Sequence, residues 1–276
     1  MMLRVPRLLR QRSEDRVRIA DLGAALGPVY AVGDVHGCSA LLRAALRGIR
    51  HDAAALGGEA TVILLGDMID RGPDSAGVLD LVCAGGGGLL GVLGNHERMM
   101  LSFMADPPAS RDWLGLGGFE TLRSYGLTLS PQDSHGARRM GQMLAAHIPD
   151  AHLALLGGLP HGYRLNVGGR DYVFTHAGLD ATRPLSAQRE ASVLWGRNGA
   201  GGYPGLCVVQ GHVVVGAPQV SDHLIRIDTG ACTSGRLSVL RLGAGLGPAV
   251  LTITAAGAAE IAQAPTARGR IDRGSH

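Results

Sequence analysis

Three short apolar runs near the start of the chain each end at a glycine followed by a polar residue. They cover residues 29–32, 62–65 and 89–93. Brief apolar runs bounded by such turn signals are typical of buried strands. The stretches that follow them predict helices over residues 39–50, 74–83 and 97–104. Strands that alternate with helices in this way predict an α/β core.

The pattern changes beyond this core. Residues 106–150 carry no strong strand signal, and we interpret them as a helical insertion. Apolar stretches then recur between glycine-rich turns, over residues 163–167, 171–175, 207–210, 224–227, 237–242 and 250–254. With little helix between them, these predict a second, mostly antiparallel sheet. We expect one domain over residues 28–255, a basic and flexible extension over 1–27, and a flexible tail over 256–276.

The residues at the ends of the first three strands carry the candidate chemistry. Asp34 and His36 follow the first strand, Asp67 the second and Asn95 the third. These segments are spaced by roughly 30 residues, the length of a strand-helix-strand unit, so they should meet at the carboxyl edge of one sheet. Oxygen ligands mixed with imidazoles at one edge indicate a metal centre.

Two later histidines extend this set. His176 and His212 each follow an apolar strand. Any one of these residues alone would more often belong to a turn or be a hydrogen-bonded residue of the core. Five such segments, all at strand ends, are unlikely to occur by chance. The donors exceed the needs of one tetrahedral ion and suit two ions that share a carboxylate. Such a pair promotes in-line displacement at phosphorus.

Composition excludes several other classes of function. All 26 basic residues are arginine, so a P-loop, a Schiff-base enzyme and a Ser-Lys hydrolase are excluded. Aromatic residues make up 4% of the chain and the net charge is only +3, so we expect no nucleic-acid partner. No apolar stretch is long enough for a membrane span. The four cysteines lack paired spacing, which favours a reduced, cytoplasmic location.

Taken together, these motifs resemble those of the calcineurin-like metallophosphoesterases of the phosphoprotein phosphatase family, especially the bacterial and bacteriophage Ser/Thr protein phosphatases. The resemblance runs from Val29 to about Leu242. It rests on the motifs at residues 33–37, 66–72, 94–97, 113–126, 174–179, 195–197, 211–212 and 227–231. It implies an α/β fold of two packed sheets flanked by helices, an αββα sandwich.

The resemblance also implies a role for each site residue. Asp34 and His36 would bind the first metal ion and Asp67 would bridge to the second. The second ion would be completed by Asn95, His176 and His212. His96 would protonate the leaving group, with Asp70 orienting its ring. The phosphoryl oxygens would be bound by Arg71, Asn95 and Arg197.

These assignments predict a phosphomonoesterase that acts on phosphoserine and phosphothreonine in proteins, with direct attack by a hydroxide held on the two metals. Manganese is the expected metal, with iron and zinc as the alternative. The chief rival function is symmetrical dinucleoside tetraphosphate hydrolysis, and a third is non-catalytic phosphate sensing. Asp70 favours ester substrates, because a phosphate leaving group needs less protonation. The chain departs from the family pattern at residues 198–202, on the substrate side of the site, and at residues 213–215, in the loop that follows His212.

Overall fold

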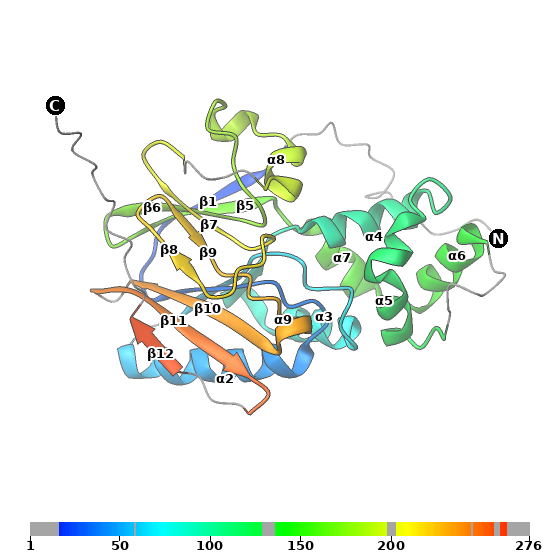
Figure 1. Ribbon diagram of the computed structural model, residues 1–276, viewed down its shortest axis with the longest axis horizontal. Coiled ribbons are helices and arrows are strands. Elements are labelled where there is room, and N and C mark those ends of the chain that lie inside the picture. The colour runs from blue at the N-terminus through cyan, green and yellow to red at the C-terminus, as the bar shows by residue number, and fades with distance from the viewer. Residues whose placement is uncertain are drawn as a thin grey trace.

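The computed structural model describes residues 17–57, 59–128, 136–197, 203–243, 245–256 and 260–263. Two six-stranded sheets lie face to face in it (Figure 1). The first has the strand order β12–β11–β10–β2–β3–β4. Its strands are β2 (Val29–Val32), β3 (Thr61–Leu64), β4 (Leu89–Gly91), β10 (Arg236–Gly243), β11 (Leu246–Thr254) and β12 (Glu260–Gln263). β2, β3 and β4 are parallel, whereas β10, β11 and β12 add antiparallel pairings.

The second sheet has the order β1–β5–β6–β7–β9–β8. Its strands are β1 (Ile19–Ala24), β5 (Gly162–Val167), β6 (Arg170–Thr175), β7 (Cys207–Gln210), β8 (Gln219–Val220) and β9 (Leu224–Arg226). β6, β7 and β9 run parallel, so their carboxyl ends share one edge. This edge and the equivalent edge of the first sheet position the site described below.

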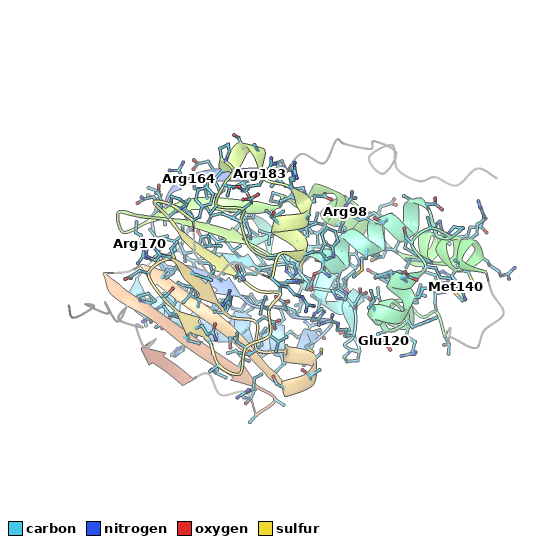
Figure 2. All side chains as sticks on the ribbon, turned by 45° about the horizontal axis from the view of Figure 1, so that its top comes forward. Arg98, Glu120, Met140, Arg164, Arg170 and Arg183 are labelled. Carbon is cyan, nitrogen blue, oxygen red and sulfur yellow. The ribbon has the colours of Figure 1, made fainter. Side chains whose placement is uncertain are left out.

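Helices cover the outer faces of the sandwich and form a lobe beside it (Figure 1). α2 (Ser39–Leu56) lies along the first sheet, followed by α3 (Ser75–Ala84), and α8 (Glu190–Trp195) lies on the side of the second sheet. The lobe contains α4 (Asn95–Ala105), α5 (Phe119–Ser124), α6 (Ala137–His147) and α7 (Asp150–Gly158). Figure 2 labels Met140 in this lobe, and Arg164 and Arg170 on the second sheet away from it. The remaining short turns are η1 (Gly86–Gly88), η2 (Leu114–Gly118), η3 (Leu185–Ala187) and α9 (Ala231–Ser234).

The alternation of side chains along the strands builds two apolar layers. In β2, Val29 and Ala31 face the second sheet and join the cluster that contains Phe174 and Val209. Tyr30 and Val32 face the other way and pack with the residues of α2. Successive residues of a strand point to opposite faces, so a strand buried on both sides is apolar throughout. This explains why β2 appears as an uninterrupted apolar run.

The predicted α/β sandwich is confirmed, but the arrangement of its second half differs from the prediction. The expected strands at 237–242 and 250–254 extend the first sheet instead of the second. The second sheet is also mixed, because β6, β7 and β9 are parallel. Local apolar patterns identify strands, but partner choice depends on contacts distant in sequence.

The two predicted terminal segments also contain strands. β1 lies within the expected extension over residues 1–27 and pairs with β5. β12 lies within the expected tail over 256–276 and pairs with β11. Residues 1–16 and 264–276 lie outside the described residues. Among the described residues of 106–150, the regular elements are helices and turns. None of the described helices combines the length and apolar character that a bilayer crossing requires.

A buried ion pair connects α2 to the first sheet. Arg241 on β10 donates to both carboxylate oxygens of Asp52 at 3.1 and 3.2 Å. The Tyr30 hydroxyl donates to the same carboxylate at 2.8 Å. Asp52 and Arg241 are 8% and 5% exposed, so removing one charge would leave the other buried without its partner.

We therefore expect Asp52→Asn to lower the free energy of unfolding by about 3–5 kcal/mol. Urea denaturation followed by circular dichroism measures this change. The matched control is Asp222→Asn, which removes an exposed carboxylate that lies 3.7 Å from Arg170. It should leave the denaturation midpoint almost unchanged. Equal midpoints for the two variants would contradict the role of the buried pair.

Candidate metal centre and catalytic site

The carboxyl ends of five strands bring the predicted donors to one place. Asp34 follows β2, Asp67 follows β3, and Asn95 begins α4 just after β4. His176 follows β6 and His212 follows β7. Because β2, β3 and β4 are parallel, as are β6 and β7, each set of loops emerges at one edge of its sheet. The contacts below show that the two sets meet.

One group of donors surrounds His176. Its Nε2 lies 2.8 Å from Asn95 Oδ1, 3.1 Å from His212 Nδ1 and 3.4 Å from Asp67 Oδ1. The His176 Nδ1 lies 2.8 Å from the Leu65 carbonyl, so Nδ1 carries the proton and donates it there. Nε2 is then an acceptor facing two oxygen acceptors. Converging lone pairs fit a cation, and Asp67, His176 and His212 form one of the groups able to hold a metal ion.

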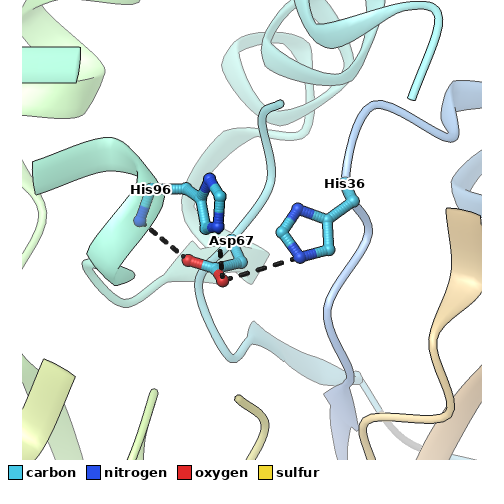
Figure 3. A group of neighbouring side chains, drawn as sticks. All are labelled: His36, Asp67 and His96. Atoms are coloured by element: carbon cyan, nitrogen blue, oxygen red, sulfur yellow. Dashed lines mark hydrogen bonds and ion pairs between the residues drawn. The ribbon is translucent and has the colours of Figure 1, made fainter. Parts of the chain in front are cut away.

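A second group lies on the other side of Asp67. His36 and His96 direct their rings toward the Asp67 carboxylate from two directions (Figure 3). Their Nε2 atoms lie 3.6 and 3.9 Å from Asp67 Oδ2. The two terminal nitrogens of Arg71 lie 2.9 Å from these Nε2 atoms, one against each ring. His36, Asp67 and His96 form the second group able to hold a metal ion, so Asp67 is common to both.

Asp34 lies against the segment that carries His212. The backbone N–H of His212 lies 3.2 and 3.1 Å from the two Asp34 carboxylate oxygens. A Cβ on Gly211 would lie 1.9 Å from Asp34 Oδ1, so only glycine permits this approach. Burial, then the charges of Asp228 and Asp67, raise the pKa of Asp34 well above its usual range. Three neighbouring buried carboxylates are unfavourable without positive charge between them.

The predicted His96–Asp70 pair is present and fully buried. His96 Nδ1 lies 2.7 Å from Asp70 Oδ2. Burial alone would lower the pKa of His96, but the hydrogen bond to Asp70 and the charge of Asp67 outweigh it and raise that pKa. Asp70 and Asp67 thus favour the charged form of the ring, whereas the neighbouring charge of Arg71 opposes it. Such a buried, partnered imidazole has the properties of a general acid.

Two residues of the helical insertion hold Asp70 in place. Trp113 Nε1 donates to Asp70 Oδ2 at 2.7 Å, and the Thr121 hydroxyl donates to Oδ1 at 2.6 Å. Both residues are almost completely buried. Burial raises the pKa of Asp70, and the hydrogen bonds from His96, Thr121 and Trp113 oppose that rise. These donors favour the carboxylate that His96 requires as a partner.

The buried carboxylate of Glu97 fixes the loop that carries Asp67. It accepts hydrogen bonds from the backbone N–H groups of Asp67, Met68 and Ile69, and from that of Gly94. Glu97 also closes the first turn of α4, where Asn95 and His96 lie. One side chain thus joins the loop after β3 to the start of α4. This arrangement fixes Asp67 relative to Asn95.

Backbone strain is concentrated in the predicted site. Among the described residues, those other than glycine with positive φ are His36, Asp67, Asp70, Arg71 and His212. All five are predicted site residues. Positive φ costs free energy for residues with a Cβ and is commonly retained where function requires the geometry.

The structure brings the predicted residues together with one partial exception. Arg197 is exposed, and within the described ranges no hydrogen bond or ion pair holds it. Its charge nevertheless acts with burial and His176 to lower the pKa of His212 to about 4, which indicates that it lies on the His212 side. The neighbouring residues 198–202 lie outside the described residues.

Sequence reasoning assigned no role to Asp228, Glu97, Trp113 or Thr121. All four lie in motifs that carried the family resemblance, at residues 227–231, 94–97 and 113–126. The motifs were therefore a signal, but their hydrogen-bond partners depend on the folded chain.

Comparison with known proteins identifies the family. The family model for calcineurin-like phosphoesterases matches residues 27–226. The chain is 31% identical over 222 residues to serine/threonine-protein phosphatase 1 of Salmonella typhimurium, covering 78% of this chain and 91% of that protein. The chain therefore belongs to the calcineurin-like phosphoesterase family, whose members hydrolyse phosphate esters.

Other relatives carry a different substrate name. The chain is 39% identical over 88 residues to the symmetrical bis(5'-nucleosyl)-tetraphosphatase of Paracidovorax citrulli, a match that covers 31% of this chain and 30% of that protein. A solved structure of a candidate diadenosine tetraphosphatase aligns with a TM-score of 0.59 and 25% identity, over 86% of this chain and 98% of that one. A cold-active protein tyrosine phosphatase shares the fold at a TM-score of 0.55 and 17% identity, over 91% of this chain and 82% of that one.

The shared position of Asp67 gives a direct test of the centre. We expect Asp67→Asn to lose most of the divalent metal that the purified protein retains, because a neutral amide cannot replace a carboxylate between two cations. Metal analysis by mass spectrometry after desalting measures the loss. Asp171→Asn serves as the control and should retain its metal. An Asp67→Asn protein that is fully loaded with two ions would contradict the bridging role.

Proposed function

We propose that this phosphoesterase removes phosphate from phosphoserine and phosphothreonine in proteins. The observation that carries the proposal is the buried Asp70–His96 pair, held by Trp113 and Thr121. A serine or threonine alkoxide is a poor leaving group and needs a proton as the P–O bond breaks. A phosphate leaving group needs much less assistance. His96, held in position by Asp70, should therefore accelerate the hydrolysis of alkyl phosphate esters most.

The residues of the site supply the other parts of this reaction. Two divalent cations bound around Asp67 would activate water for attack and neutralise charge on the phosphoryl group. The other ligands would be Asp34, His36, Asn95, His176 and His212, which leaves His96 free to carry a proton. Arg71 lies between His36 and His96, where its guanidinium can bind two phosphoryl oxygens. Asn95 and Arg197 would contact the remaining oxygens. His96 then donates its Nε2 proton to the departing alkoxide, and Asp70 stabilises the ring.

The comparisons support this choice without excluding the alternative. The Ser/Thr phosphatase match spans most of both chains, whereas the dinucleotide hydrolase match covers less than a third of each. The structural match to a candidate diadenosine tetraphosphatase also spans most of both chains, and this match favours hydrolysis of dinucleoside tetraphosphates. Symmetrical dinucleoside tetraphosphate hydrolysis is therefore the alternative to be tested.

Replacing the acid should reveal its role through the leaving group. We expect His96→Asn to lower kcat on a phosphothreonine peptide by roughly 10²–10⁴. The loss should be much smaller with p-nitrophenyl phosphate, whose phenolate leaves without a proton. Phosphate release under saturating substrate measures both. His147→Asn, on the exposed face of α6, is the control and should match the wild type. Equal losses on both substrates would contradict the acid role.

Direct competition of substrates tests the proposed class. We expect kcat/KM for a phosphothreonine peptide to exceed that for diadenosine tetraphosphate, with manganese present in both assays. Chromatography of the nucleotide products and colorimetry of released phosphate measure the two rates. A faster reaction with the dinucleotide would replace our proposal with the alternative function.

A further inference from the structure

A cavity of about 350 Å³ lies beside the site on the lobe side. Its walls come from α4, from the turn before η2, and from α8. The lining includes Arg98, Met99, Asp112, Trp113, Glu190 and Trp195. None of them has a role in the proposed chemistry, apart from the contact of Trp113 with Asp70.

The cavity adjoins the proposed reaction centre. Met99 lies three residues after His96 on α4, so the two share a helix face and are separated by about 4.5 Å along the helix axis. Trp113 borders the cavity and hydrogen-bonds Asp70. Trp195 precedes Arg197 by two residues, and the neighbouring Val193 carbonyl accepts the backbone N–H of Ala177, next to His176. A group in this cavity would therefore be close to a phosphoryl group bound at the centre.

The charges around the cavity leave one carboxylate without a cation. Glu190 is bound by Arg98 at 3.1 Å and by His161 at 3.0 Å. Arg98 lies on α4 where the lobe meets the sandwich (Figure 2), and its charge is engaged by Glu190. Asp112 is exposed, and within the part of the chain that the structure describes no ion pair engages it. The lining therefore has an excess of negative charge.

Apolar surface is also available to a ligand. Trp195 lines the cavity and is 42% exposed, so its indole ring is accessible to a ligand. Met99 adds a flexible thioether to the same lining. An indole face beside a free carboxylate suits a long side chain with an apolar stem and a cationic end.

We propose that this cavity binds an arginine or lysine side chain near the phosphorylated residue of a protein substrate. The stem would lie on Met99 and Trp195, and the cationic group would contact the Trp195 ring and the Asp112 carboxylate. The inference rests on the proposed function and adds a sequence preference to it. The small volume and negative charge also disfavour the second nucleotide of a polyphosphate substrate.

Peptide kinetics test the proposal. The substrates are phosphothreonine peptides in an alanine background, each with one arginine at a position from −3 to +3. We expect one position to raise kcat/KM about tenfold over the all-alanine peptide, the combined size of an exposed cation–π contact and a surface ion pair. Because the comparison is made within each enzyme, it does not depend on overall activity.

Variants then identify the residues responsible. Trp195→Ala and Asp112→Asn should each bring the arginine-to-alanine ratio close to one. Asp112→Arg should reverse the preference, so that glutamate at the same position becomes favourable. The control Asp222→Asn removes an exposed carboxylate on the second sheet and should keep the wild-type ratio.

Each result has a defined meaning. Efficient hydrolysis of all phosphopeptides with no preference for arginine, or a preference that survives Asp112→Asn and Trp195→Ala, overturns this inference alone. A preference for an aromatic or aliphatic residue instead of arginine also overturns it. Rapid cleavage of diadenosine tetraphosphate with no hydrolysis of any phosphopeptide overturns the proposed function and this inference together.

Discussion

The mutual repulsion of buried acceptors is the constraint on which this site depends. Asp34, Asp67 and Asp228 bring three carboxylates close together, and His176 presents a lone pair to the oxygen of Asn95. Acceptors removed from water and facing one another destabilise the folded chain unless positive charge compensates them. The fold nevertheless fixes them in place through backbone hydrogen bonds to Asp34 and through the contacts of Glu97. The fold therefore loses stability at these buried carboxylates, as expected if the function requires cations bound between them.

The sandwich makes this convergence possible because its two sheets present their carboxyl ends to the same region. Asp67 and Asn95 come from the first sheet, whereas His176 and His212 come from the second. Close contact between the loops requires backbone without side chains at particular points. A Cβ on Gly94 would lie 2.3 Å from the Asp67 backbone nitrogen, so this glycine brings α4 against the loop after β3. Gly94, which precedes the proposed ligand Asn95, is therefore required for the geometry of the site.

The sequence alone predicted the α/β class, the family and the residues that meet at the site, because these depend on local features. Apolar runs of strand length followed by Gly-Asp or Gly-Asn indicate both a strand and the donor at its end. Sheet membership was predicted less well. The strands at 237–242 and 250–254 have the same apolar character as those of the second sheet, and only long-range packing decides that they pair with β2 and with each other. Similarly, nothing local to Trp113 or Thr121 indicates that both reach Asp70, since that contact spans more than 40 residues.

The attachment of the lobe to Asp70 has a consequence for how such proteins can diversify. Trp113 and Thr121 belong to a segment that could otherwise be exchanged or resized like any peripheral addition. Because that segment completes the hydrogen bonding of the proton donor's partner, a graft from a relative would have to reproduce these two anchors to keep turnover on alkyl esters. Exchange of this segment between relatives is thus restricted by catalysis as well as by folding. We expect active chimeras to take the segment, Asp70 and His96 from the same parent.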